Sequence, residues 1–324
     1  MTRAPDARTG QRRVSIVDAV APPERLAMLR ILVGAFAVGY LVIRLPVYLQ
    51  LGDRRSGFDG VGLAALVDRP VPSSVVDAVV AATMLTGVGF VLGWRFRVNG
   101  PLFAVGMLAL GSYRGSWGQL LHFENLMVIY LLIIAVSPAS DAWSIAARHR
   151  TRHHDRHRDG ARRESVAYGF PIALAALALV ITYVIAGVAK LRYGGLDWVF
   201  GDTLRNHVAY AAARLDLLGG SPSPFAGWIV RLDGIWPLLA AGTIVIELAA
   251  PVALLGGRIR TAWVIAAWLL HAGVLVFMLI GFPFPLFLVA FAPLYRVERL
   301  WTDRPTWLAR SRYQRVPRTA SATR

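Results

Sequence analysis

The chain has 324 residues, of which 56% are hydrophobic and 17% are charged, whereas a soluble domain has roughly 45–50% and about 25%. An ordinary soluble enzyme is therefore excluded as the leading interpretation. Cysteine is absent, which excludes disulfides, thiolate metal sites and cysteine nucleophiles. The formal net charge is +16, so the placement of the charges has to decide between nucleic acid and a membrane surface.

Eight apolar segments have about the length that a helix needs to cross the hydrocarbon core of a bilayer. They cover residues 26–43, 75–92, 98–113, 119–136, 171–189, 235–255, 262–280 and 284–294. Their runs are continuous and rich in Leu, Ala and Val, which favours helices over barrel strands. We predict an all-α, polytopic membrane bundle of about eight transmembrane helices. The segments 98–113 and 284–294 are short, so whether they cross completely stays open.

The arginines predict the orientation of this bundle. With eight spans, one side of the membrane receives 24 of the 35 Lys and Arg residues and the other side receives nine. An excess of Lys and Arg marks cytoplasmic loops, so we expect both termini in the cytoplasm. The chain then divides into a cytoplasmic tail (1–24), a transmembrane domain (25–296) with an external loop (190–234), and a basic cytoplasmic tail (297–324).

The basic tail is typical of contact with anionic membrane lipid on the cytoplasmic side. Nucleic acid is not expected as a partner, because no compact soluble domain remains to present a basic face.

Lys190 is the only lysine beside 34 arginines. Arginine stays protonated in proteins, whereas a partly buried lysine can lose its proton and act as a base or a nucleophile. Tyr183, Gly187 and Lys190 share one face of the predicted fifth helix, and the glycine leaves room for another group to approach. The alternative is a lysine that anchors the helix end by snorkelling.

Two further groups of ionisable residues lie within predicted spans, where such residues commonly face a cavity or a partner. His122, Glu124 and Asn125 begin the fourth span at about the depth of Lys190. Glu247 and His271 lie near the middle of the sixth and seventh spans and could form a buried pair. For both groups a structural hydrogen bond between helices is the competing interpretation.

The remaining charged positions give weaker indications of a functional site. Arg30 and Arg44 lie near the ends of the first helix, where both can snorkel, although Arg44 on the external side could hold an anionic group. Histidines at 149, 153 and 157 have the i, i+4 spacing of a zinc site, but the surrounding arginines repel a cation. We interpret that run as a solvated cytoplasmic loop and expect no metal.

A resemblance to a known family adds to this interpretation. The stretch 185–191, Ile-Ala-Gly-Val-Ala-Lys-Leu, is followed by Asp197 and Trp198 and then by 204–207, Leu-Arg-Asn-His. This pattern resembles the central signature of the vitamin K-dependent gamma-carboxylases and of their bacterial relatives, the horizontally transferred transmembrane (HTTM) domain proteins. Segments 26–33 and 122–135 also resemble the family, so that about residues 23–296 are covered.

The resemblance implies roles for several residues. Lys190 matches the lysine that deprotonates reduced vitamin K, and His122 matches a histidine that stabilises developing charge. We therefore expect quinol-linked chemistry with a reduced, menaquinol-like quinone in a bacterial cytoplasmic (inner) membrane, and a substrate-binding set of Trp198, Asp197 and His207. Arg44 joins this set because of its predicted external position. The chain lacks the large luminal domain of the carboxylases and has Ala189 in place of the first residue of their lysine pair, so peptide carboxylation does not follow.

A non-enzymatic function fits the same residues. In that alternative the protein is a membrane partner or maturation factor for a secreted peptide, which it contacts through residues 190–234. A transporter would use Glu247 and His271 as a relay, but the sequence has no clear inverted halves.

Overall fold

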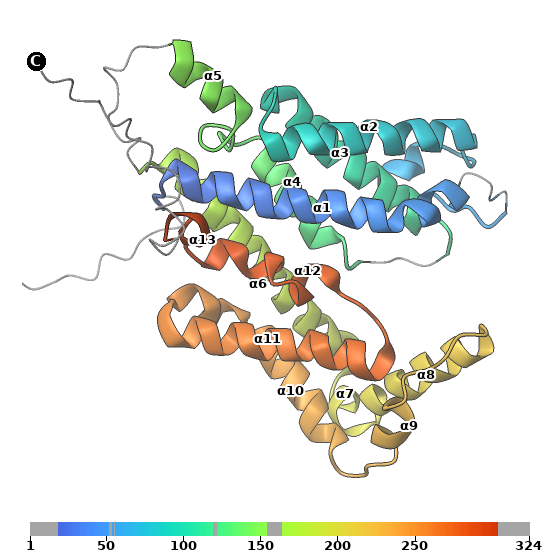
Figure 1. The fold of residues 1–324 in the computed structure, drawn as a ribbon. Coiled ribbons are helices and arrows are strands. Elements are labelled where there is room, and N and C mark those ends of the chain that lie inside the picture. Colours follow the sequence, from blue (N-terminus) through green and yellow to red (C-terminus); the bar gives the residue numbers. More distant parts are fainter. Residues whose placement is uncertain (1–18, 52–53, 55, 119–121, 154–163, 304–324) are drawn as a thin grey trace, which may run out of the picture.

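The computed structural model describes residues 19–51, 54, 56–118, 122–153 and 164–303. Apart from one bridge between Ala21 and Ser165, the secondary structure of these residues is helical, which confirms the all-α class (Figure 1). Four helices are long and apolar enough to cross a membrane: α1 (Pro23–Leu51), α2 (Ser73–Leu92), α6 (Val166–Gly194) and α11 (Gly257–Met278). At about 1.5 Å per residue, even a 20-residue helix reaches the roughly 30 Å of the hydrocarbon core.

The remaining predicted spans are less regular, and the structure does not confirm a count of eight. The third is α3 (Phe96–Gly115), and the fourth is α4 (Asn125–Ala135), which has 11 residues. The sixth divides into α10 (Trp236–Leu248) and the 3-10 helix η4 (Ala250–Leu255). Pro251 explains this break, because its ring lacks an N–H and restricts the residue before it.

The prediction of a continuous eighth helix at 284–294 was wrong. This segment consists of α12 (Pro283–Leu286) and the 3-10 helix η5 (Val289–Leu294), separated by Leu288 with a φ of 64°. Its prolines at 283, 285 and 293 prevent a continuous helical hydrogen-bond ladder. Phe284 and Phe291 are buried in the protein. Irregular backbone at membrane depth is tolerated where protein covers it.

The described parts of the arginine-rich segments that the charge count assigned to one side lie together at one end of the molecule. Ala21 pairs with Ser165, Arg25 forms an ion pair of 2.8 Å with Glu298, and Arg260 donates to the carbonyl of Leu294. Figure 1 places the start of α1, α5 (Ile145–His153) and α13 (Arg299–Thr302) at this same end. That this end faces the cytoplasm stays a prediction.

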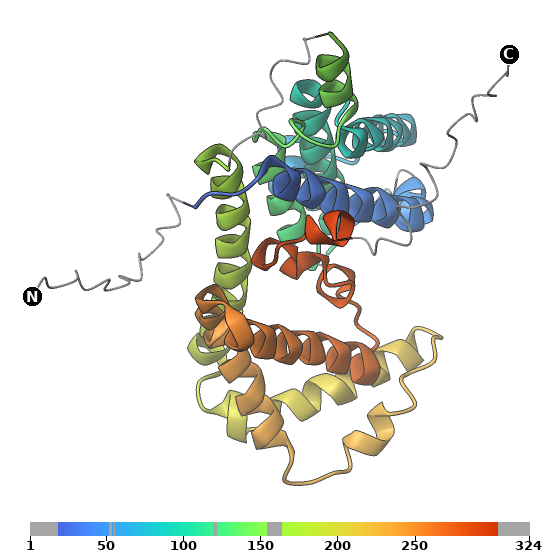
Figure 2. The same cartoon turned by 60° about the vertical axis from the view of Figure 1, so that its left-hand side comes forward.

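The predicted external segment lies at the opposite end, where Figures 1 and 2 show it beside the end of α11. It contains α7 (Asp197–Phe200), α8 (Thr203–Leu217) and α9 (Ala226–Ile229). A small cluster of Val208, Ala226, Ile229 and Trp236 holds it together, and the Ser223 hydroxyl donates to the carbonyl of Val276 on α11 at 2.5 Å. A short 3-10 helix, η2 (Gly62–Leu66), packs against α3.

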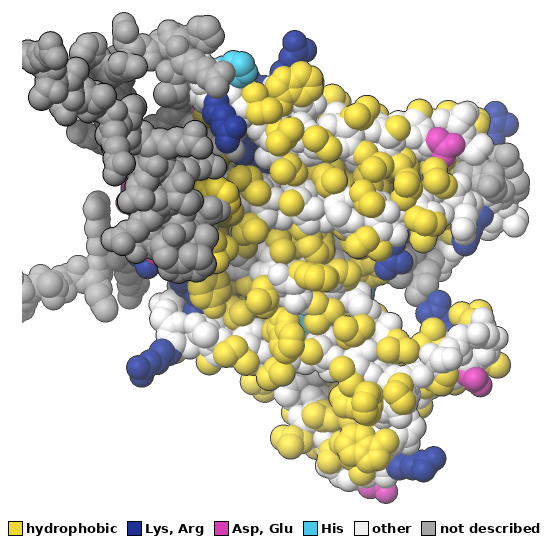
Figure 3. Space-filling view, viewed as in Figure 1, with side chains coloured by type: hydrophobic (Ala, Val, Ile, Leu, Met, Phe, Trp, Pro, Cys, Tyr) yellow, Lys and Arg dark blue, Asp and Glu magenta, His cyan; other side chains and the backbone are white. Residues whose placement is uncertain are grey.

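The long sides of the bundle carry apolar side chains. Figure 3 shows hydrophobic side chains spread across this face, with charged side chains mainly toward its margins. Ile43 and Leu85 are 77% and 74% exposed although they lie on spanning helices. Such exposure suits a surface that contacts lipid rather than water.

Arg30 does not snorkel, which corrects the expectation for this residue. Its side chain is fully buried, and its guanidinium donates to the carbonyls of Ala139 at 2.7 Å and Trp143 at 2.6 Å. The arginine thereby ties α1 to the loop between α4 and α5.

Replacing Arg30 with Met should lower the thermal unfolding temperature of the purified protein, because the buried carbonyls lose a charged donor. Charged hydrogen bonds of this kind contribute about 1.5–3 kcal/mol. The exposed Arg97→Met at the same end is the control and should change little. Equal unfolding temperatures for the two variants would contradict the proposed tie.

Candidate functional site

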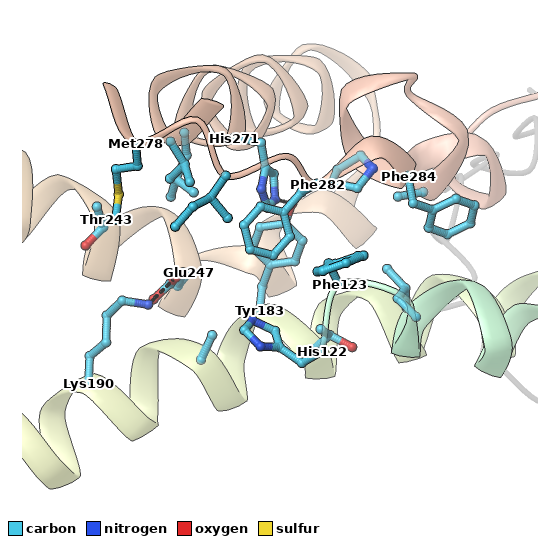
Figure 4. Close-up of a pocket in the computed structure, with 18 of the residues that line it drawn as sticks. His122, Phe123, Tyr183, Lys190, Thr243, Glu247, His271, Met278, Phe282 and Phe284 are labelled. Atoms are coloured by element: carbon cyan, nitrogen blue, oxygen red, sulfur yellow. Dashed lines mark hydrogen bonds and ion pairs between the residues drawn. The ribbon is translucent and has the colours of Figure 1, made fainter. Parts of the chain in front are cut away.

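A cavity of about 510 Å³ lies between the start of α4, the outer half of α6, α10, α11 and the cap formed by α7 and α8. Six of the eight predicted site residues line it: His122, Lys190, Trp198, His207, Glu247 and His271. Five of them lie on separate helices, and His122 lies just before α4. Figure 4 shows His122, Lys190, Glu247 and His271 around the cavity. The rest of the lining is largely aliphatic and aromatic.

Lys190 and Glu247 form an ion pair across the cavity wall. The Lys190 amine lies 2.5 Å and 2.7 Å from the two carboxylate oxygens of Glu247, and 5.3 Å from the centre of the Trp198 ring. The lysine side chain is 21% exposed and the glutamate side chain 8%. Lys190 is therefore neither free in solvent nor a simple snorkelling anchor.

Gly187 makes this pairing possible. A Cβ atom at this position would lie 2.9 Å from Leu248 Cδ2 and 3.1 Å from Glu247 Cβ. The missing side chain lets α10 approach α6 one turn before Lys190, as small residues do at helix contacts in membranes. The space expected beside this glycine is filled by α10, which brings Glu247 within reach of the lysine.

Glu247 and His271 line the same cavity but are not paired with each other. While Glu247 bonds to Lys190, the Nε2 atom of His271 lies 2.8 Å from the hydroxyl of Tyr183 on α6. The predicted Glu247–His271 contact is thus replaced by two pairs, each of which joins α6 to a different helix. The Nδ1 atom of His271 is buried and has no hydrogen-bond partner among the described residues.

His122 lies on the opposite wall from α10. Its ring centre is 5.8 Å from that of Phe282, which lies 5.0 Å from the ring of His271 on its other side. Figure 4 shows His122, Phe282 and His271 gathered in one part of the cavity and Lys190 with Glu247 in another.

Trp198 and His207 line the cavity at the end covered by α7 and α8. Their ring centres are 5.7 Å apart, and the indole Nε1 of Trp198 is buried without a partner among the described residues. Buried polar atoms are normally hydrogen-bonded, whereas Trp198 Nε1 and His271 Nδ1 are enclosed by protein atoms and have no partner among the described residues.

Two residues predicted to bind substrate do not line the cavity. Asp197 is exposed at the start of α7, where its carbonyl accepts a hydrogen bond from the Thr203 hydroxyl. Arg44 lies on α1, with its guanidinium 5.8 Å from the centre of the Tyr40 ring. Asp197 was predicted to bind substrate because it belongs to the family signature. The turn into α7 brings only its neighbour Trp198 to the cavity.

A buried charge cluster beside the cavity was missed. Arg114 of α3 lies 2.9 Å from the Glu124 carboxylate, which also accepts a hydrogen bond from the Tyr40 hydroxyl. The side chains of Arg114 and Glu124 are 6% and 7% exposed. Arg114 also lies over the Phe123 ring at 5.0 Å, so the cluster holds the segment that carries His122. The sequence contains a signal for this cluster, because Arg114 and Glu124 carry opposite charges at about the same predicted depth. Arg114 entered the sequence analysis only as one of the nine Lys and Arg residues on the less basic side.

Among the described residues, no group of three His, Asp or Glu side chains is arranged to hold a metal ion. Of the histidines with zinc-like spacing, His149 is exposed on α5, and residue 157 lies outside the described residues. The cavity suits an apolar ring with hydroxyl or carbonyl groups, because its lining is mostly apolar and includes a few polar side chains, among them His122, Thr243 and Lys190.

A double-mutant cycle should detect the ion pair. Lys190→Met leaves Glu247 without its partner and should destabilise the protein by about 2–4 kcal/mol, since an unpaired buried charge is costly. Glu247→Leu added to Lys190→Met should restore much of this loss. Independent, additive effects in thermal unfolding would contradict the pairing.

The comparisons with known proteins place this geometry in a family. No curated protein and no solved structure matches the chain. A model of the HTTM domain matches residues 20–301, which is nearly the whole chain. The chain therefore belongs to the HTTM domain family, the membrane-domain family associated with vitamin K-dependent carboxylase.

Proposed function

We propose that the cavity binds a reduced, lipid-soluble quinone of the menaquinol type, and that Lys190 takes a proton from its hydroxyl group. The observation that carries this proposal is the convergence of Lys190 and His122 on one apolar cavity. His122 would then stabilise the negative charge that develops on the quinol oxygen. We place this cavity at the external side of a bacterial inner membrane, with both termini in the cytoplasm.

The size and lining of the cavity support such a ligand. Pockets of 300–1,000 Å³ with apolar walls and a few polar groups are typical of small-molecule sites, and this cavity has about 510 Å³. Phe123, Tyr183 and Phe282 offer ring faces and edges, which pack favourably against an aromatic head group. His122, Thr182 and Thr243 supply polar side chains to the cavity lining.

The position of Thr182 supports entry of the ligand from the bilayer. This residue lines the cavity, yet it is exposed in the middle of α6, on a helix that is long enough to span the membrane. An exposed position at that depth contacts the lipid. A quinol dissolved in the bilayer would therefore reach the cavity without crossing the external aqueous phase.

The surroundings of Lys190 support a role in proton transfer. A general base has to lie within hydrogen-bonding reach of the proton that it accepts. The amine lines the cavity between the Glu247 carboxylate and the Trp198 ring, and its side chain is only 21% exposed. Water therefore has limited access to the amine, and a bound hydroxyl group could approach it.

Lys190→Ala and Lys190→Arg should both reduce quinol oxidation by purified protein, by about 100-fold or more, which is the usual contribution of a positioned acid or base. Arginine keeps the positive charge but does not give up its proton. Arg192→Ala, an exposed residue two positions further on, is the matched control and should retain turnover.

Undiminished turnover in both Lys190 variants would contradict the proposal. Extraction of the wild-type protein in mild detergent, followed by identification of bound lipids, tests the ligand separately. A quinone should co-purify with the wild type.

The exposed surface of the cap favours a second candidate function, in which the protein is a partner or maturation factor for a secreted peptide. Five aromatic side chains between residues 190 and 234 are strongly exposed: Tyr193 at 82%, Phe200 at 72%, Tyr210 at 69%, Trp228 at 58% and Phe225 at 52%. Aromatic residues are enriched at protein interfaces. These side chains do not line the cavity and would offer a binding surface that does not involve Lys190.

The two functions predict opposite sensitivities. If the peptide-partner function holds, Trp228→Ala should weaken binding of the peptide at least about tenfold, which corresponds to 1.4 kcal/mol. Lys190→Ala should leave that binding unchanged. The measurement is an affinity titration of nanodisc-embedded protein with secreted peptides encoded beside its gene. Peptide binding that depends on Lys190 and not on Trp228 would contradict this second function.

A further inference from the structure

Glu247 is the residue in direct contact with Lys190, the proposed base. Both of its carboxylate oxygens are within hydrogen-bonding distance of the amine, at 2.5 Å and 2.7 Å. Its side chain is 8% exposed, and among the described residues Lys190 is its hydrogen-bond partner. Any role of Glu247 in the reaction therefore acts through its contact with the lysine amine.

The contact creates a difficulty for lysine as a base acting alone. An ionised carboxylate at this distance favours the ammonium form of its partner, and an ammonium group has no lone pair with which to accept a proton. Removing the lysine proton to bulk water would leave an unpaired carboxylate in a poorly solvated site, which is costly. The proton therefore needs a nearby acceptor, and Glu247 is in direct contact.

We propose that Lys190 and Glu247 act as one acid–base unit in which Glu247 is the final proton acceptor. This inference rests on the proposed quinol site. The O–H bond of the bound quinol breaks and its proton forms an N–H bond on Lys190, while one ammonium proton of Lys190 moves to a Glu247 oxygen. The electron pair stays on the quinol oxygen, so the products are a quinolate anion, a Lys190 ammonium and a neutral Glu247 carboxylic acid.

The charges favour this assignment. At rest the ion pair and the neutral quinol together carry no net charge. After the transfer, the unit carries one positive charge and faces one negative quinolate, so the cavity as a whole remains neutral. Charge separation over a hydrogen-bond length in a poorly solvated site costs far less than an isolated charge. Lys190 then also stabilises the anion that it helped to form.

The other titratable groups at the cavity are less suited to this role. His271 bonds to Tyr183 through Nε2, and His122 and His207 contact aromatic rings. The carboxylate of Glu124 is engaged with Arg114 and Tyr40 and does not line the cavity. Among the described residues that line the cavity, Glu247 is thus the carboxylate in contact with the lysine.

The test measures where the hydroxyl proton goes. The probe is 4-methoxy-1-naphthol, which resembles a half-protected naphthoquinol, has a single ionisable hydroxyl and changes its absorbance when that hydroxyl ionises. It is titrated into full-length protein in lipid nanodiscs. Absorbance reports ionisation of the bound naphthol, and calorimetry in two buffers of different ionisation enthalpy counts the protons released.

Wild-type protein should bind naphtholate without releasing a proton, because Glu247 receives it. Glu247→Gln removes the acceptor, so at a pH low enough for Lys190 of this variant to be already protonated, any bound naphtholate should be accompanied by release of about one proton to the buffer. Glu247→Asp keeps a carboxylate and should behave as the wild type does. Val245→Thr, on the outward side of α10 and 63% exposed, controls for general changes in that helix.

The inference is overturned if Glu247→Gln forms naphtholate without proton release, as the wild type does, or if the wild type itself releases the proton. If wild-type protein fails to bind or ionise the naphthol, the proposed quinol function fails as well, so the two failures are distinguishable. Should Glu247→Gln not fold, the infrared difference spectrum of wild-type protein decides. A protonated carboxylic acid band should appear on naphthol binding, and its absence would contradict the inference.

Discussion

The ion pair between Lys190 and Glu247 is the constraint on which the candidate site depends. Two opposite charges are held between α6 and α10 with little exposure to solvent, where each would be costly without the other. Gly187 permits the close approach of the two helices, and the pair in turn fixes the register at which they meet. The amine is thereby kept at the cavity wall, beside the Trp198 ring, instead of extending into water.

Two other buried arginines, Arg30 and Arg114, hold the two ends of the short helix α4. Arg30 binds the carbonyls that follow α4 at one end, and Arg114 with Glu124 and Tyr40 fixes the segment before α4 at the other. Both ends of this short helix are therefore held by charged groups that the apolar environment makes expensive to leave unpaired. The placement of His122 on the cavity wall follows from the second cluster, since Glu124 lies two residues further along the chain.

The all-α class, the long apolar helices and the family could be predicted from the sequence, because hydropathy, span length and a local signature are one-dimensional signals. The lone lysine, the glycine one turn before it and the ionisable residues within spans indicated where chemistry could lie. The partner of Lys190 could not be predicted, because pairing across α6 and α10 depends on helix rotation and register that periodicity does not determine. A continuous eighth helix was predicted because the segment is hydrophobic. The helix-breaking effect of its prolines at 283, 285 and 293 was not taken into account. Asp197 was predicted to bind substrate because it stands beside Trp198 in the signature. In the structure only Trp198 lines the cavity, whereas Asp197 is exposed.

An experimental structure of the protein in lipid nanodiscs, determined with and without added menaquinol under reducing conditions, tests the central claim most directly. The account predicts that the Lys190 amine contacts Glu247 in the quinol-free protein and that a planar ligand occupies the cavity between Lys190 and His122 when quinol is present. A structure in which Lys190 extends into bulk water, with Glu247 bound elsewhere and the cavity filled by the protein's own side chains, would contradict it.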